Sequence, residues 1–283
     1  MMWQQQFVQT KRGVFEIFVA GEGEPLCVTH LYSAFNANGN HFANMFVPFF
    51  KVYLVNLRGC GNSTDDTTVY EYSMNHTVAD LEAIRAALQL DEWAFAGHST
   101  GGMLALSYAV QAPAHLSFIV GGGLCASRDY MYDPASIYCR ENPHNARLKE
   151  IFALLKDPTA TLAQRQAVSK EWMYMSLYQE SSYVKLIQQP NSGKTVGKRL
   201  DYFSYEELPT FDLRPQLPTV ETKAYIYGGV HDAQCPYTYA VEAAHLLPNA
   251  TLTTFHKSNH FPFDEEPDAF AQFVQTIGLE VKR

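Results

Sequence analysis

The feature that most constrains the fold is an abrupt change of pattern at residues 97–101, Gly-His-Ser-Thr-Gly. The preceding residues 93–96 are apolar and have the length of a buried strand, whereas residues 102–111 have the apolar spacing typical of a helix. A strand that turns directly into a helix is half of a strand–helix–strand unit, and such units build parallel sheets. This stretch therefore favours an α/β fold.

The same alternation of strand and helix patterns recurs in both halves of the chain. Short apolar runs without a polar face, as in strands covered on both sides, lie at residues 26–29, 52–55, 93–96, 116–120, 223–227 and 252–255. Helical patterns lie at residues 78–88, 102–111, 237–247 and 267–277. Alternating residues 7–10 and 14–19 predict a hairpin. We expect a mostly parallel eight-stranded sheet with an N-terminal antiparallel hairpin and helices on both faces.

A long middle segment shows no strand pattern and is helical and aromatic instead. Its large side chains are Tyr130, Tyr132, Tyr138, Trp172, Tyr174, Tyr178, Tyr183, Tyr202 and Tyr205, with Met131, Met173 and Met175. We expect residues 128–207 to form a helical cap (lid) inserted into a core built by residues 1–127 and 208–283. Most of these aromatic side chains are expected to pack the cap onto the core, and the remainder to line a pocket.

Composition and charge limit the classes of function. The 283 residues are 47% hydrophobic and 18% charged, which is typical of a soluble globular core with a modest insertion. A net charge of −8 without a dense Lys/Arg run argues against nucleic acid as a partner. We expect no secretory leader, and no window of the sequence comes near the roughly 18 apolar residues of a membrane span. We expect a cytoplasmic protein without membrane contact.

The cysteines indicate reduced thiols. Five of them, an odd number, are widely spaced and never form a C-x-x-C pair: Cys27, Cys60, Cys125, Cys139 and Cys235. This usage fits small core residues better than a disulfide framework or a zinc site. We expect no metal and no other cofactor. A cysteine nucleophile would need a histidine brought beside it by the fold, and the chain offers a better nucleophile.

That better candidate is Ser99, at the centre of the Gly-x-Ser-x-Gly turn. A serine at such a turn lies in strained backbone so that its hydroxyl protrudes, and glycines two residues to either side let neighbouring backbone pass. The turn also places the backbone N–H of Thr100 at a helix N-terminus, where negative charge is stabilised. Ser99 and Thr100 therefore predict a nucleophile and one oxyanion donor.

A serine nucleophile needs a histidine base and a carboxylate that fixes the histidine tautomer. His260 follows the last predicted strand, and Asp232 follows the preceding one, so both lie where strand ends gather in an open α/β sheet. Taken singly, Asp232 could be a turn or helix-capping carboxylate and His260 a packed loop residue. Taken together, their placement predicts a triad with Ser99.

Other histidines near these motifs are expected to be structural. His98 precedes the nucleophile on the turn, so its side chain should point away from the serine hydroxyl. His231 and His256 lie beside Asp232 and at a strand end. His30 follows the first buried strand and is expected to organise the loop that supplies the second oxyanion donor.

These motifs, together with residues 56–63 (Asn-Leu-Arg-Gly-Cys-Gly-Asn-Ser), resemble the α/β-hydrolase superfamily, nearest its prolyl aminopeptidase (proline iminopeptidase) branch. The resemblance covers both core segments, and the chain order Ser, Asp, His matches it. It implies that Ser99 is the nucleophile, His260 the general base and then acid, and Asp232 its orienting carboxylate. It also implies an oxyanion hole from the backbone N–H groups of Tyr32 and Thr100.

Two departures from that branch concern the oxyanion hole and the turn. His30-Leu31-Tyr32 replaces the usual His-Gly, so either Leu31 or Tyr32 could supply the second donor. Thr100 stands where the branch tends to have Trp. An aminopeptidase also needs cap carboxylates for the free amine of its substrate, and four are available: Glu141, Glu150, Glu171 and Glu180.

The sequence thus predicts a serine hydrolase that cleaves an ester or amide bond of a small-molecule or short-peptide substrate through an acyl-enzyme. An N-terminal amino-acid amide is slightly favoured, on the likeness of residues 58–61 to the aminopeptidase branch. A small-molecule carboxylesterase is the alternative within the same chemistry. A ligand-binding or signalling protein on the same fold, with incidental hydrolysis, is the alternative of another class.

Overall fold

A mixed, mostly parallel sheet lies at the centre of the computed structural model, which describes residues 2–65 and 72–281. Its strands are β1 (Gln4–Thr10), β2 (Gly13–Ala20), β3 (Pro25–Val28), β5 (Lys51–Val55), β6 (Trp93–His98), β7 (Leu116–Gly122), β9 (Lys223–Gly229) and β10 (Ala250–Phe255). The eight strands are ordered β1-β2-β5-β3-β6-β7-β9-β10. The β1–β2 and β2–β5 pairs are antiparallel and the others parallel, which confirms the predicted sheet and hairpin.

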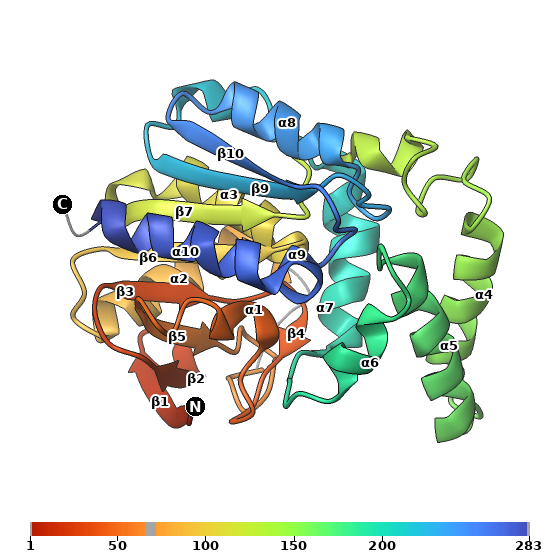
Figure 1. Cartoon of the computed structure of the whole chain (residues 1–283). Helices are drawn as coiled ribbons and strands as arrows, with labels where there is room; N and C mark the ends of the chain where they lie inside the picture. Colours follow the sequence, from red (N-terminus) through yellow and green to blue (C-terminus); the bar gives the residue numbers. More distant parts are fainter. Residues whose placement is uncertain (1, 66–71, 282–283) are drawn as a thin grey trace.

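Helices cover both faces of the sheet (Figure 1). One hydrophobic cluster joins the sheet to α2 (Met74–Ala87), α3 (Thr100–Gln111) and α8 (Tyr237–Leu246). A second cluster, on the opposite face, joins it to α1 (His41–Asn44) and α10 (Pro267–Val281). Alternate residues of β6 enter opposite clusters, Phe95 the first and Ala96 the second. Because both faces of these strands are buried, their sequences are unbroken apolar runs.

Several elements extend past the ends that the apolar patterns indicate. β1 begins with three exposed glutamines, which carry no apolar signal. α2 begins four residues before residue 78, where the Ser73 hydroxyl caps it by accepting a hydrogen bond from the His76 N–H. Within the described residues, no helix has both the length and the apolar character needed to cross a membrane.

Between β7 and β9 the chain forms a helical segment beyond the carboxyl ends of the strands (Figure 1). It contains α4 (Asn145–Lys156), α5 (Leu162–Met175), α6 (Ser182–Ile187) and α7 (Gly197–Tyr202), followed by a π-helical turn at Phe203–Glu207. It also contains β8 (Lys194–Thr195), which pairs antiparallel with β4 (Ser33–Ala34). The sequence indicated no strand there, because a two-residue strand is too short to show an alternating pattern.

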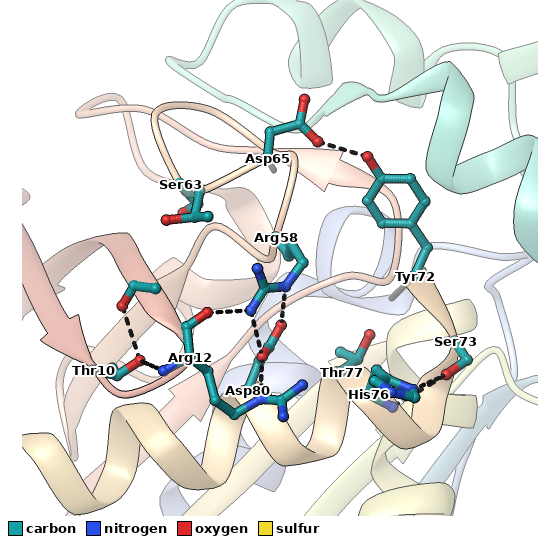
Figure 2. A network of polar contacts seen from close by, with 12 residues as sticks. Thr10, Arg12, Arg58, Ser63, Asp65, Tyr72, Ser73, His76, Thr77 and Asp80 are labelled. Atoms are coloured by element: carbon teal, nitrogen blue, oxygen red, sulfur yellow. Dashed lines mark hydrogen bonds and ion pairs between the residues drawn. The ribbon is translucent and has the colours of Figure 1, made fainter. Parts of the chain in front are cut away.

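The loop of residues 56–63 builds a buried polar network (Figure 2). The Arg58 guanidinium donates through Nε and Nη2 to both carboxylate oxygens of Asp80, at 2.8 and 2.9 Å. Arg12, from the β1–β2 turn, donates to the same carboxylate at 2.6 Å. Glu16 of β2 accepts from the side chain of Asn56 at 2.7 Å. This loop therefore ties the hairpin to α2.

Candidate active site

Ser99 occupies a strained turn between β6 and α3. Its backbone has φ 58° and ψ −125°, a conformation that side chains rarely adopt. The Ser99 N–H donates to the Gly122 carbonyl at 2.8 Å, which fixes the turn to β7. A Cβ on Gly97 would lie 2.0 Å from the Gly101 carbonyl oxygen, and one on Gly101 2.6 Å from that of Thr29. Both glycines are therefore required by close backbone approaches.

His260 and Asp232 form a buried pair on neighbouring loops after β10 and β9. The His260 Nδ1 lies 2.9 and 3.0 Å from the two carboxylate oxygens of Asp232. One of these oxygens, Oδ1, also accepts the backbone N–H groups of Gln234 and Cys235, both at 2.9 Å. An ionised carboxylate in this position holds the proton of the imidazole on Nδ1, which leaves Nε2 as the basic nitrogen.

Ser99 and His260 line one cavity of about 250 Å³. The core contributes the aromatic side chains of Phe35, Phe42 and Phe263, and the helical segment contributes Trp172 and Met173. Among the aromatic residues predicted for the cap, Tyr132 and Tyr138 line a different cavity of about 600 Å³. Ser99 and His260 thus line one cavity of aromatic, aliphatic and polar side chains, and Asp232 is hydrogen-bonded to His260.

The two residues predicted to supply oxyanion donors, Thr100 and Tyr32, both contact His30. The Nε2 of His30 is 3.2 Å from the hydroxyl oxygen of Thr100, and its Nδ1 is 3.5 Å from the backbone nitrogen of Tyr32. Ser33 Oγ lies 3.0 Å from the same Nδ1. Burial and the neighbouring His260 and Arg199 lower the pKa of His30 to about 3, so its ring stays neutral. His30 therefore links the two donor segments without adding charge.

The two candidates for the second donor, Leu31 and Tyr32, have different surroundings. Tyr32 lines the cavity with Ser99, whereas Leu31 is buried in the hydrophobic cluster. The Leu31 carbonyl accepts a hydrogen bond from Arg199 Nε. This arrangement favours the Tyr32 N–H.

His98 lies against the candidate base. The centroids of the His98 and His260 rings are 4.6 Å apart, and His98 Nδ1 is 2.9 Å from the Tyr227 hydroxyl. Burial, with the nearby His260 and His30, lowers the pKa of His98 well below its ordinary value. His98 is thus a neutral side chain that packs against the His260 ring. His231 is exposed and stacks on Tyr178, with ring centroids 4.4 Å apart, and His256 is exposed.

The four cap glutamates lie away from the Ser99 cavity. Glu141 lines the larger cavity, and Glu150 and Glu171 bind Arg147 at the surface. Glu180 is exposed. Among the described residues that line the Ser99 cavity, Asp264 is the one with a carboxylate side chain. One of its carboxylate oxygens lies 2.9 Å from His41 Nδ1.

Two polar side chains at the cavity carried no sequence motif. Gln234 donates through Nε2 to the Ser176 hydroxyl at 2.8 Å, and both residues line the cavity. Gln234 lies two residues after Asp232, which is the one signal that could have indicated it. Ser176 follows α5, and only the packing of the helical segment brings it here.

All five cysteines are buried and unpaired, as their spacing predicted. Across residues 2–65 and 72–281, no group of three or more His, Cys, Asp or Glu side chains is arranged to hold a metal ion.

A nucleophile turn between strand and helix, at the carboxyl edge of this mixed sheet, defines the class of α/β hydrolases. The chain belongs to the alpha/beta hydrolase fold family, whose family model matches residues 31–267. An alpha/beta fold family hydrolase from Bacillus anthracis str. Sterne is 51% identical, with a TM-score of 0.96 over 98% of this chain and 99% of that chain.

More distant relatives carry different activities in their names. A proline iminopeptidase of Heyndrickxia coagulans is 26% identical over 241 residues, which cover 79% of this chain and 79% of that protein. An esterase from Exiguobacterium antarcticum is 22% identical, with a TM-score of 0.66 over 97% of this chain and 99% of that chain. The esterase likeness shows the fold alone. The family likeness thus identifies a hydrolase without identifying its substrate.

Proposed function

We propose that this protein is a serine hydrolase that transfers the acyl group of a small ester or amide to water through a covalent acyl-enzyme. The observation that carries the proposal is the His260–Asp232 pair, which lies beside the cavity that Ser99 also lines. The strained Ser99 backbone supports it, because such strain is typical of functional positions.

In the first half-reaction, Ser99 Oγ attacks the substrate carbonyl carbon while His260 Nε2 accepts the hydroxyl proton. Negative charge develops on the carbonyl oxygen, and the N–H groups of Thr100 and Tyr32 stabilise it. His260 then donates the proton to the leaving group. In the second half-reaction, water replaces the leaving group, and the same histidine removes its proton and returns it to Ser99.

The cavity favours an ester with a compact apolar acyl group. Aromatic and aliphatic side chains line it, and the segment of residues 128–207, which we propose as the cap, supplies Trp172, Met173 and Leu186. The aminopeptidase reading relied on Arg58 and its neighbours, but the Arg58 guanidinium binds Asp80 in the buried network. Its role there is structural, so the motif does not favour a peptide substrate.

An N-terminal amino-acid amide is the second candidate. Asp264 favours it, because a carboxylate at the cavity could hold a substrate ammonium group, and proline iminopeptidases are among the relatives. His41 already lies 2.9 Å from that carboxylate, however, and its raised pKa, which reflects the hydrogen bond to Asp264, favours the charged imidazolium. A substrate amine would have to compete with this pair, so we place the ester first.

The deciding experiment compares initial rates on p-nitrophenyl acetate and butyrate with rates on the p-nitroanilides of proline and alanine. Ser99→Ala is the test variant, and Ser117→Ala, at an exposed position of β7, is the matched control. We expect ester turnover that Ser99→Ala abolishes and Ser117→Ala retains. Turnover of the anilides instead would establish the aminopeptidase. Turnover that persists in Ser99→Ala, or tight ligand binding without turnover, would contradict the proposed acyl-enzyme.

A further inference from the structure

Arg199 of α7 is a buried cation whose contacts reach the oxyanion loop. Its side chain is 1% exposed. Nε donates to the Leu31 carbonyl, Nη1 to the Arg58 carbonyl at 3.0 Å, and Nη2 to the Thr77 hydroxyl at 2.9 Å. These three acceptors are neutral, so the guanidinium is held by dipoles rather than by direct contact with a carboxylate. Burial of such a charge is costly unless its hydrogen bonds are made.

The contact with Leu31 fixes the direction of the neighbouring N–H. The Leu31 carbonyl and the Tyr32 N–H belong to one peptide unit, and no peptide bond in the described residues is cis. In a planar trans peptide, the C=O and N–H bonds point in opposite directions. Because the carbonyl points at Arg199, the N–H points away from it. That direction is toward His30: the Tyr32 N–H donates a long hydrogen bond, 3.5 Å, to His30 Nδ1, and His30 Nε2 in turn contacts the Thr100 hydroxyl.

The chain around Arg199 holds the next peptide unit as well. The Val196 N–H donates to the Tyr32 carbonyl at 2.8 Å. One residue further on, Ser33 pairs with Thr195 where β4 meets β8. Residues 194–199 of the helical segment thus contact the loop of residues 31–34 at consecutive positions. Arg199 supplies the contact nearest to the donor peptide.

We propose that Arg199 is a positioning residue for the oxyanion hole, which holds the Leu31–Tyr32 peptide so that the Tyr32 N–H can exchange its long hydrogen bond to His30 Nδ1 for one to the reacting carbonyl oxygen. This proposal rests on the acyl-transfer function proposed above. A cation on the carbonyl side also polarises the peptide and strengthens its N–H as a donor. Arg199 does not line the cavity and acts through the peptide.

Arg199→Met is the main test, because methionine keeps an unbranched stem and removes every donor. Loss of one oxyanion donor lowers kcat by about 10²- to 10³-fold in serine hydrolases. We expect a fall in kcat of about 10²-fold for Arg199→Met on a p-nitrophenyl ester, with KM within about threefold of wild type, because the donor acts in the transition state. Arg199→Lys keeps the charge and one donor group, so we expect a smaller fall of about tenfold.

Thr77→Val is the matched control. It removes the third hydrogen bond of Arg199 within the same buried cluster but leaves the Leu31 contact in place. We expect a lower unfolding temperature and a kcat within about twofold of wild type. The proposal is overturned if Arg199→Met has the same kcat as Thr77→Val. If the methionine variant does not fold, the same comparison is made with Arg199→Lys. A change confined to KM would overturn it equally.

Amide hydrogen exchange tests the loop independently of turnover. We expect faster exchange for the backbone of residues 31–34 in Arg199→Met, or in Arg199→Lys if only that variant folds, than in wild type and Thr77→Val. Identical exchange would overturn the proposal even with an active enzyme. If wild type neither cleaves esters nor reacts with a fluorophosphonate at Ser99, the acyl-transfer function fails, and the exchange comparison still decides whether Arg199 orders the loop.

Discussion

At the scale of single residues, the candidate site depends on close approaches between backbone segments that only glycine permits. Ser99 holds a positive φ because β6 and α3 meet at a turn in which chain segments touch. Gly97 and Gly101 remove the Cβ atoms that would separate those segments. The reactive position of the hydroxyl is therefore a consequence of close packing around it, and it should be lost when that packing is disturbed.

Gly97→Ala tests this dependence. The new methyl group would lie 2.0 Å from the Gly101 carbonyl oxygen, so the turn must move. We expect loss of fluorophosphonate labelling at Ser99 together with a lower free energy of unfolding, measured by chemical denaturation. Gly197→Ala is the control, because no atom lies within 4 Å of the Cβ position there. Normal labelling in Gly97→Ala would show that the turn tolerates the shift.

Asp232→Asn tests the orienting carboxylate. An amide can donate to the His260 Nδ1 and so favour the tautomer with the proton on Nε2, which cannot accept the serine proton. We expect kcat to fall by about 10²- to 10⁴-fold with little change in the folded structure. Steady-state kinetics and circular dichroism check this, with Asp212→Asn in a surface ion pair as the control. A full rate in Asp232→Asn would assign the orienting role to another carboxylate.

At the scale of elements, α2 is joined to the hairpin and to the loop after β5 by one buried carboxylate. Asp80 is 1% exposed and forms ion pairs with both Arg12 and Arg58 (Figure 2). The side chain of Arg58 is itself nearly buried. Removing the carboxylate would leave buried positive charge without its counter-charge, which is more costly than removing a surface partner.

Asp80→Asn should therefore lower the free energy of unfolding by about 3–5 kcal/mol. Glu150→Gln, which removes a surface partner of Arg147, is the comparison and should change stability little. Urea denaturation of wild type and both variants measures the two differences. Equal effects would mean that the Asp80 network adds no more than a solvent-exposed ion pair.

At the scale of the whole molecule, Glu265 connects the helical segment to the loop that carries His260. Its carboxylate accepts the backbone N–H of Tyr178 from the helical segment and that of Asn259, the latter at 2.7 Å. Burial raises the pKa of Glu265 to about 7, against the opposing effect of these hydrogen bonds. The helical segment and the His260 loop therefore meet at a carboxyl group whose pKa is raised to about 7.

This titration predicts a pH dependence of stability. Because the folded protein binds the Glu265 proton more tightly than the unfolded chain, the associated stabilisation is complete below the ordinary pKa of 4.5 and is lost as the pH rises through about 7. We expect wild type to lose stability relative to Glu265→Gln between pH 5 and pH 8. Chemical denaturation at both values measures this. Glu24→Gln, on an exposed turn, corrects for the loss of one negative charge.

The sequence by itself determined the sheet, most helices and the three candidate triad positions. These features follow from local patterns: apolar runs for strands buried on both faces, apolar spacing for helices, and glycines around Ser99. Asp232 and His260 were accessible because each follows a predicted strand, and parallel strands end at the same edge of a sheet. Local patterns failed first at exposed ends, such as the glutamines of β1, where no burial constrains the residue type.

Only the tertiary structure decided which groups surround that triad. The burial of Leu31, the exposure of Tyr32 to the cavity, the positions of the four glutamates and the contacts of Arg199 depend on segments far apart in the chain. Leu31 and Arg199 are separated by 168 positions, and Arg199 belongs to no motif. A hydrogen bond between a backbone carbonyl and a distant side chain needs only one donor at one position. It requires no repeated residue type, so neither segment shows a sequence pattern that would predict the contact.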